Sequence, residues 1–121
     1  MERGHCVSTC IKPWQVWWLD LNPTIGHEQA GRRPAIVVSS HFHLGLTRNA
    51  LVSILPLTTR ERPEWGHRIR IDIPGQCIGW AITEQVRTVS FGRFSRGTPI
   101  GCLNDDQIVK VRTVLAMMLD I

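Results

Sequence analysis

The chain has 121 residues and a mass of 13.7 kDa, a size that predicts a single domain. Hydrophobic residues make up 43% of it and charged residues 20%, which argues against a disordered chain. No apolar run reaches the ~18 residues of a membrane span, and the N-terminus lacks the apolar segment of a signal peptide. We therefore expect a cytoplasmic protein with no membrane association, comprising an irregular leader (residues 1–12) and one domain (residues 13–121).

The positive charges of the chain are nearly all arginines. Lysine and arginine number 14 against 10 acidic residues, a formal net charge of +4, yet the lysines are only Lys12 and Lys110. A guanidinium can grip a phosphate group through two parallel hydrogen bonds, which an ammonium cannot do. The count therefore hints at an anionic partner, although a total of this kind is a weak signal.

The first part of the chain reads as strands separated by loops. Runs rich in aromatic and β-branched residues, or alternating between apolar and polar residues, predict strands over 14–21, 34–40, 51–58, 67–73 and 80–89. The clearest alternation is in 67–73, where three isoleucines share one face. The connection over 22–33 is 12 residues long, whereas hairpin loops normally take about 2 to 5.

The end of the chain reads as one helix over 105–119. Asn104 and Gln107 have the spacing of a capping box, and the two aspartates that follow Asn104 suit the positive end of a helix. Apolar residues then recur at helical spacing. Since strands and helices do not alternate, we predict a mainly β, α+β fold: a small antiparallel barrel or half-barrel of about five or more strands with a closing helix.

The cysteines and histidines predict no metal site. Cys6 and Cys10 are four positions apart beside His5, but Cys77 and Cys102 do not complete a second ligand pair. His41 and His43 would point to one face of an extended segment, where two imidazoles can act as acid and base on RNA. We interpret both instead as surface or turn histidines, because the stretch around them is polar.

Three polar clusters are candidates for chemistry. The long loop ends in Arg32 and Arg33, and the following Pro34 holds Arg33 in an extended conformation. A second cluster, Thr58–Arg60, follows a strand, where hydroxyls cap turns or bind phosphate oxygens. The third contains Glu84, in a predicted strand that is otherwise apolar enough to be interior. A carboxylate there needs either an ion pair with an arginine or a catalytic role.

These clusters make the sequence recognisable. The blocks WWLDLNPTIGHEQAGRRPAIVVSS, LPLTTR and EQVRTVS occur in this order and resemble the MazF/PemK family of toxin endoribonucleases. The resemblance extends from Trp14 to the C-terminal helix. Its most specific part is the G-x-E-Q-x-G-x-R-P string that ends at Pro34.

The resemblance implies an SH3-like antiparallel barrel with a C-terminal helix, assembled as a homodimer. It implies an enzyme that cuts single-stranded RNA at short sequences without a metal or other cofactor, and a cognate antitoxin that blocks the RNA groove. The alternatives are a non-catalytic gyrase poison like the related CcdB toxins and a plain SH3-like protein-binding module. The long loop disfavours the first of these, and the absence of tyrosine disfavours the second.

The family motif carries over to numbered residues of this chain. Arg33 would clamp the phosphate, Thr58 would donate a hydrogen bond to it, and Glu84 is the third catalytic candidate. The general base is left open between Glu84 and His27. The residues expected to bind RNA are Gly26, His27, Glu28, Gln29, Arg32, Thr59, Arg60, Gln85 and Arg87.

Overall fold

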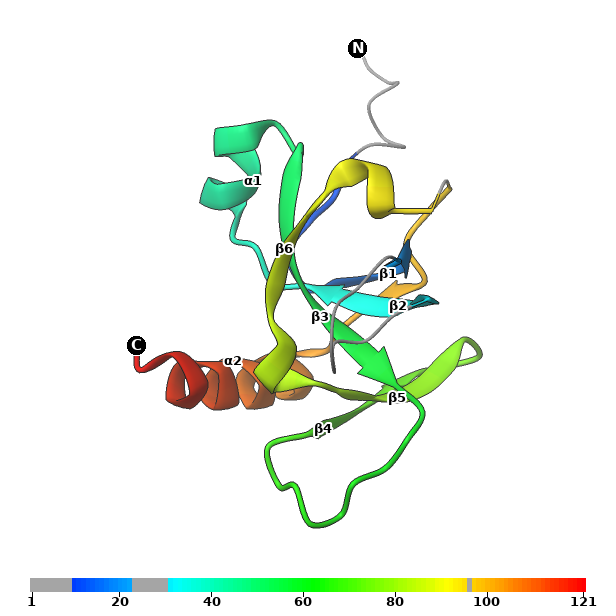
Figure 1. Cartoon of the computed structure of the whole chain (residues 1–121), viewed down its shortest axis with the longest axis vertical. Helices are drawn as coiled ribbons and strands as arrows, with labels where there is room; N and C mark the ends of the chain where they lie inside the picture. The colour runs from blue at the N-terminus through cyan, green and yellow to red at the C-terminus, as the bar shows by residue number, and fades with distance from the viewer. Residues whose placement is uncertain (1–9, 23–30, 96) are drawn as a thin grey trace.

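A strongly bent antiparallel sheet of seven strands, with two α-helices beside it, forms the body of the protein (Figure 1). The structure is a computed structural model and describes residues 10–22, 31–95 and 97–121. The elements in chain order are β1 (Gln15–Asp20), β2 (Arg32–Val37), α1 (His41–Thr47), β3 (Leu51–Thr58), β4 (Ile69–Ile73), β5 (Cys77–Ala81), η2 (Thr83–Gln85), β6 (Arg87–Ser90), η3 (Phe91–Arg93), β7 (Gly101–Cys102) and α2 (Asp105–Leu119).

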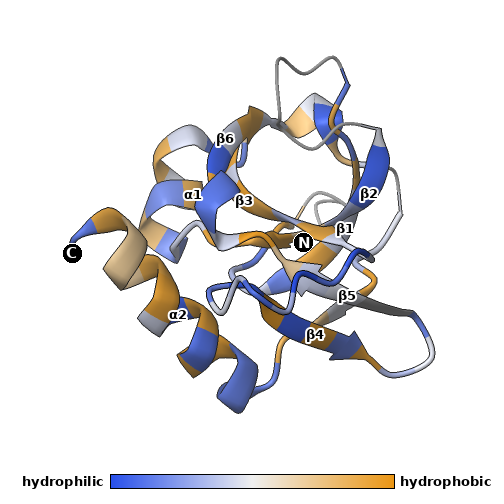
Figure 2. Ribbon diagram, turned by 60° about the horizontal axis from the view of Figure 1, so that its bottom comes forward, coloured by the Kyte–Doolittle hydropathy of each residue, from blue (hydrophilic) through white to orange (hydrophobic). Residues whose placement is uncertain are grey.

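Strand β3 is the centre of the sheet, because it pairs with three other strands. β2 lies along one edge, with Ala35 opposite Pro56. On the other edge, β6 pairs with the first half of β3 and β5 pairs with its last two residues. The segment after β6 returns to β1 through a bridge between Phe94 and Leu19, which nearly closes a barrel (Figure 2).

Alternation along the strands builds two apolar cores. One face of β1 sends Trp17 and Leu19 into the barrel, where they meet residues of β2, β3 and β6. The opposite face sends Val16 into a second cluster, which β4, β5 and α2 cover. β3 contributes to both clusters, with Ile54 in the first and Leu55 in the second. The central strands are therefore buried on both faces over much of their length.

Helix α2 closes the second core. The Asn104 side chain accepts a hydrogen bond from the Gln107 amide across 2.8 Å, and the Gln107 side chain accepts one from the Asn104 amide across 2.9 Å. Val111 and Leu115 then pack on the sheet. The predicted helix over 105–119, its capping box and the antiparallel barrel with a C-terminal helix are confirmed.

The predicted strand over 80–89 is wrong as a single strand. Both of its ends lie along the same edge of β3, where Ala81 pairs with Leu57 and Arg87 pairs with Ile54. Three more residues separate Ala81 from Arg87 than separate their partners on β3. This surplus forms the 3-10 turn η2, which leaves the sheet much as a β-bulge does.

The histidine pair also differs from the extended arrangement considered from the sequence. Residues 41–47 form helix α1, which begins where the Ser40 hydroxyl accepts a hydrogen bond from the His43 amide. Two positions apart on a helix, His41 and His43 do not share a face. His43 instead contacts the buried Ser39 hydroxyl through Nδ1 at 2.7 Å.

The N-terminal boundary of the packed region lies before residue 13. Ile11, within the expected leader, is 4% exposed and belongs to the core inside the barrel. Among the described residues, neither helix is long and apolar enough to cross a membrane.

The capping box gives a test of the α2 boundary. We expect Asn104→Ala to lower the free energy of unfolding by about 1 kcal/mol, because the Gln107 amide loses its acceptor. Equilibrium urea denaturation measures the change. Asn104→Asp, which keeps an acceptor oxygen, is the matched control and should unfold nearly like the natural protein. Equal losses in the two variants would show that the cap does not stabilise the helix.

Candidate active site

A small pocket of about 210 Å³ opens where β2 begins and β3 ends. It gathers residues that are far apart in the sequence: Trp18, Arg32, Arg33, Pro34, Leu57, Thr58, Thr59 and Gly79. Four of them, Arg32, Arg33, Thr58 and Thr59, are residues that the sequence predicted for the site. Among the described residues that line the pocket, none is acidic. The pocket therefore favours an anionic ligand.

Arg33 is held by the pairing of β2 with β3. If the register that sets Ala35 opposite Pro56 is continued by two residues, it brings Arg33 beside Thr58. The Arg33 side chain is half-buried, and its Nη1 donates to the Leu57 carbonyl across 3.4 Å. A guanidinium has five N–H donors in a planar fork, a geometry that matches the oxygens of a phosphate.

Thr58 lies at the last position of β3 and is only 8% exposed. Its Oγ1 accepts a hydrogen bond from the Arg60 amide across 3.2 Å, which turns the chain as it leaves the strand. An accepting hydroxyl retains its own proton to donate. The turn therefore fixes Thr58 and leaves its O–H as a donor for a ligand.

Gly79 lines the pocket beside Thr58. A Cβ atom at position 79 would lie 3.2 Å from the Thr58 carbonyl oxygen and 3.4 Å from the Leu57 Cβ. The first distance is tighter than an ordinary contact, so a larger residue would push β5 away from β3.

The base of the long loop is fixed by several hydrogen bonds. The Leu21 amide donates to the Gly31 carbonyl across 3.0 Å, and the Gly31 amide donates to Asn22 Oδ1 across 2.9 Å. Arg87, from β6, donates to the Leu21 carbonyl across 3.4 Å, and Arg93 donates to the Asn22 carbonyl. Of the predicted site residues, Gly26, His27, Glu28 and Gln29 lie outside the described residues.

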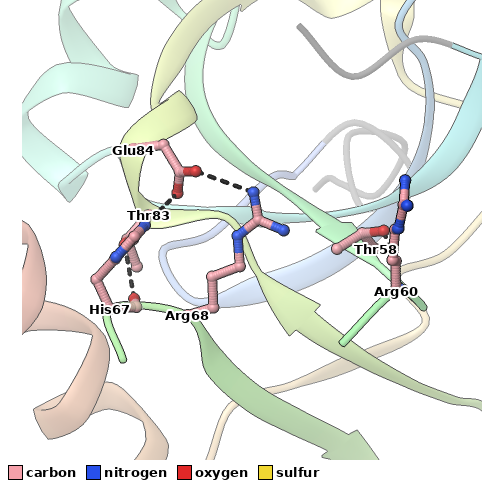
Figure 3. Close-up of polar contacts among 6 residues, drawn as sticks. All are labelled: Thr58, Arg60, His67, Arg68, Thr83 and Glu84. Atoms are coloured by element: carbon pink, nitrogen blue, oxygen red, sulfur yellow. Dashed lines mark hydrogen bonds and ion pairs between the residues drawn. The ribbon is translucent and has the colours of Figure 1, made fainter. Parts of the chain in front are cut away.

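Glu84 lies on η2 and forms an ion-pair cluster with the loop residues just before β4 rather than lining the pocket (Figure 3). Its Oε2 is 2.9 Å from Nη2 of Arg68, and its Oε1 is 3.1 Å from Nε2 of His67. The Thr83 hydroxyl donates to the His67 carbonyl across 2.8 Å. We call Glu84, His67 and Arg68 the η2 clasp, because they join η2 to the loop between β3 and β4.

The η2 clasp changes the acidity of Glu84. Burial raises the pKa of this carboxyl. Four other effects outweigh burial and bring the pKa below 4.5: the hydrogen bond from Arg68, a backbone hydrogen bond, the charge of Arg68 and the charge of His67. Of the two explanations expected for a carboxylate here, the structure supplies the ion pair with an arginine. Glu84 is not interior, however, because η2 carries it to the surface.

The remaining predicted residues lie around the same end of the sheet. Arg60 is exposed one residue beyond Thr59, and Gln85 is half-buried next to Glu84. The residue that the sequence reasoning missed is Trp18, which lines the pocket and is 42% exposed. Its signal was hidden because Trp17 and Trp18 both read as core residues of a strand. The described residues contain no group of three or more side chains suited to hold a metal ion.

A family model described as "PemK-like, MazF-like toxin of type II toxin-antitoxin system" matches residues 12–119. The chain belongs to this family. The endoribonuclease toxin MazF of Escherichia coli is 34% identical over 85 residues, which cover 67% of this chain and 72% of that toxin. The family resemblance found in the sequence is confirmed, and the alternative of a gyrase poison is not favoured.

Solved structures show the same fold. The crystal structure of MazF from Deinococcus radiodurans (Form-I) has a TM-score of 0.80 and 24% identity, and the match covers 92% of this chain and 97% of that one. In the MazE–MazF structure (Form-II) from the same organism, the matched chain has a TM-score of 0.73 and 25% identity, with 92% and 96% covered.

The acidity of Glu84 predicts a pH-dependent contribution to stability. Because the pKa of Glu84 is lowered in the folded protein, the η2 clasp stabilises the fold above the unfolded-state pKa. That stabilisation is lost as the pH falls through the folded-state pKa. We expect Glu84→Gln to unfold at lower urea concentration than the natural protein at neutral pH. The difference should shrink in acid, below the ordinary pKa of a glutamate.

The control is Glu64→Gln, which removes an exposed carboxylate from the loop between β3 and β4 and leaves Glu84 in place. Its effect should be small at both pH values. If Glu84→Gln lowers the urea midpoint by the same amount at neutral and acidic pH, the stabilisation by the η2 clasp does not depend on the charge of Glu84.

Proposed function

We propose that this toxin is an endoribonuclease that cuts single-stranded RNA by using the 2′-hydroxyl of RNA as the nucleophile. The 2′-oxygen forms a bond to the adjacent phosphorus and the bond from phosphorus to the 5′-oxygen breaks. The products are a 2′,3′-cyclic phosphate and a 5′-hydroxyl end. The proton of the 2′-OH passes to a general base, and the leaving 5′-oxygen gains a proton. The observation that carries this proposal is the shared pocket of Arg33 and Thr58.

Arg33 supplies positive charge where the reaction develops negative charge. As the 2′-oxygen attacks, charge grows on the non-bridging oxygens of the phosphate, and a fixed guanidinium stabilises it most strongly in the transition state. The contact with the Leu57 carbonyl fixes the side chain before substrate arrives, so little reorganisation is needed. Because this charge is built into the protein, the reaction is expected to proceed without a metal.

Thr58 adds a hydrogen-bond donor. Its oxygen accepts from the Arg60 amide, and we propose that the hydroxyl proton is donated to the phosphate. Arg32 and Thr59 line the same pocket and are proposed to contact neighbouring phosphates. Arg60 and Gln85 are proposed as further RNA contacts, together with the loop residues Gly26, His27, Glu28 and Gln29. Arg87 supports the base of that loop through the Leu21 carbonyl.

Glu84 is proposed to position the loop between β3 and β4 rather than to take the proton of the 2′-OH. Its lowered pKa makes it a weak base, and its two oxygens already contact Arg68 and His67 in the η2 clasp. This interpretation leaves His27 as the general-base candidate carried over from the family.

The proposed partners follow from the family. A type II toxin is paired with an antitoxin, and we propose a cognate antitoxin protein for this chain, acting in the cytoplasm. We also propose a homodimer. The C-terminal end of α2 exposes a group of apolar side chains that a second copy would cover: Met117, Met118, Leu119 and Ile121.

Cleavage in the presence of EDTA tests the reaction directly. We expect the natural protein to cut unstructured RNA in EDTA and to leave cyclic phosphate and 5′-hydroxyl ends, identified by end-specific enzymatic labelling. Arg33→Ala should lower the cleavage rate by about 10²–10³-fold, the usual loss when one donor to a developing charge is removed. Arg33→Lys keeps the charge but loses the planar fork, so its rate should lie between the two.

Thr58→Val and Thr58→Ser are the matched pair at the second position. The valine removes the donor with little change in shape, while the serine keeps it, so only the valine should be strongly impaired. Unfolding midpoints for each variant separate a lost donor from a lost fold. Intact RNA at every sequence tried with the natural protein in EDTA would refute the proposed metal-free cleavage.

The oligomeric state is tested by sedimentation at micromolar concentration. We expect a dimer, and we expect Met117→Lys, at a position that is 70% exposed on α2, to shift it toward the monomer by placing charge in the apolar contact. Lys110→Glu, a charge change at an exposed position nearer the start of α2, is the control and should leave the dimer intact. A natural protein that sediments as a monomer would contradict the proposal.

A further inference from the structure

Trp18 is a large aromatic side chain that the fold leaves open at the edge of the candidate active site. We propose that its indole ring is the stacking platform for the nucleobase beside the cleaved phosphate. This inference rests on the proposed function and identifies one subsite for the substrate. It assigns to Trp18 a role that neither the sequence motifs nor Arg33 and Thr58 supply.

The exposure of Trp18 follows from its place on β1. Alternation puts it on the same side of the sheet as Val16, which is fully buried beneath β4, β5 and α2. Trp18 lies two residues further along, and its side chain is 42% exposed. Its neighbour Trp17 points into the barrel and is 3% exposed. β4, β5 and α2 therefore cover this face of β1 at Val16 but no longer at Trp18, which borders the pocket.

The backbone of Trp18 is firmly placed. It lies opposite Pro34 in the pairing of β1 with β2, and its carbonyl accepts a hydrogen bond from the Ser95 amide across 2.8 Å. The next residue, Leu19, is fully buried and bridges to Phe94. A ring fixed in this way loses little freedom when a base stacks on it, which favours binding.

Arg32 lies over the Trp18 ring at the long end of the cation–π range. The guanidinium carbon is 6.0 Å from the indole centroid, and Nη2 is held by the Ser95 hydroxyl at 3.2 Å. This arrangement sets a cation beside an aromatic surface, as in grooves that bind single-stranded nucleic acid. Trp18 would take a base while Arg32 contacts the backbone phosphate.

The other exposed tryptophan is differently engaged. Trp65, on the loop between β3 and β4, is 39% exposed, but its ring carries Arg68 at 4.5 Å, Arg62 at 5.1 Å and the His67 ring at 5.9 Å. It therefore serves to pack this loop against the η2 clasp. Of these two indoles, only Trp18 lines the pocket with Arg33 and Thr58.

The test measures binding apart from cleavage. The probe is a short single-stranded RNA that the natural protein cuts, made resistant by a 2′-deoxy nucleotide at the cleaved position. Trp18→Leu should bind it roughly 5- to 150-fold more weakly, the range for losing one stacked base, whereas Trp18→Phe should retain most of the affinity. Trp65→Leu, a loss of an equally exposed indole outside the pocket, should bind like the natural protein.

Replacing single nucleotides of the probe by abasic ones locates the contact. At one position next to the cleaved phosphate, loss of the base should weaken binding of the probe to the natural protein as much as Trp18→Leu does. It should have no further effect in that variant, which is the coupling expected of direct partners. Urea denaturation of the Phe and Leu variants shows that both are folded, and the ratio of their affinities isolates the aromatic ring.

Two results would overturn the stacking role. One is equal binding by the Leu, Phe and natural proteins. The other is a Trp18→Leu variant whose loss of RNA affinity is the same at every abasic position tested. A variant that binds RNA normally but binds the antitoxin weakly would also overturn it, because Trp18 would then be a protein contact. Failure of the proposed function looks different: the 2′-deoxy probe is itself cut at the modified position, which shows that the 2′-hydroxyl is not the nucleophile, whether or not Trp18 contributes to binding.

Discussion

The backbone pairing of β3 with three different strands is the constraint on which the rest of the molecule depends. β2 occupies one edge of β3, while β6 and β5 share the other. Where these pairings run out, at Thr58, the start of β2 brings Arg33 and β5 brings Gly79 to the same place. The pocket is thus made by strand ends, which a well-packed sheet holds more rigidly than loops could.

The division of one edge of β3 between two strands explains where Glu84 lies. A single uninterrupted strand would alternate its side chains between core and solvent, and Glu84 would have had to occupy one of those faces. The extra residues of η2 place Glu84 outside the strand pairing. There it contacts Arg68 and His67, which end the β3–β4 loop. The cation of Arg68, only 7% exposed, is thereby neutralised where solvation is poor.

Local patterns in the sequence were sufficient for the elements whose signals are local. The capping box of α2 and the run of apolar residues in β3 are patterns of neighbouring residues, and both elements begin and end where the sequence predicts. The seven-residue helix α1 is too short to show a helical period, and η2 depends on a register set by distant residues. Likewise, nothing local tells Trp17 from Trp18, because β1 is apolar on both faces and only its covering layers distinguish them.

The number of arginines alone is a weak indication of function, but the individual arginines differ in what their guanidinium groups contact. Arg68 meets a carboxylate, whereas Arg87 and Arg93 meet the backbone carbonyls of Leu21 and Asn22 and so hold a loop in place. Arg32 donates to the Ser95 hydroxyl and Arg33 donates to the Leu57 carbonyl, and both residues line the pocket. The contacts of Arg68 thus join η2 to the β3–β4 loop, whereas Arg32 and Arg33 bring guanidinium groups to the place where the proposed reaction develops negative charge on a phosphate.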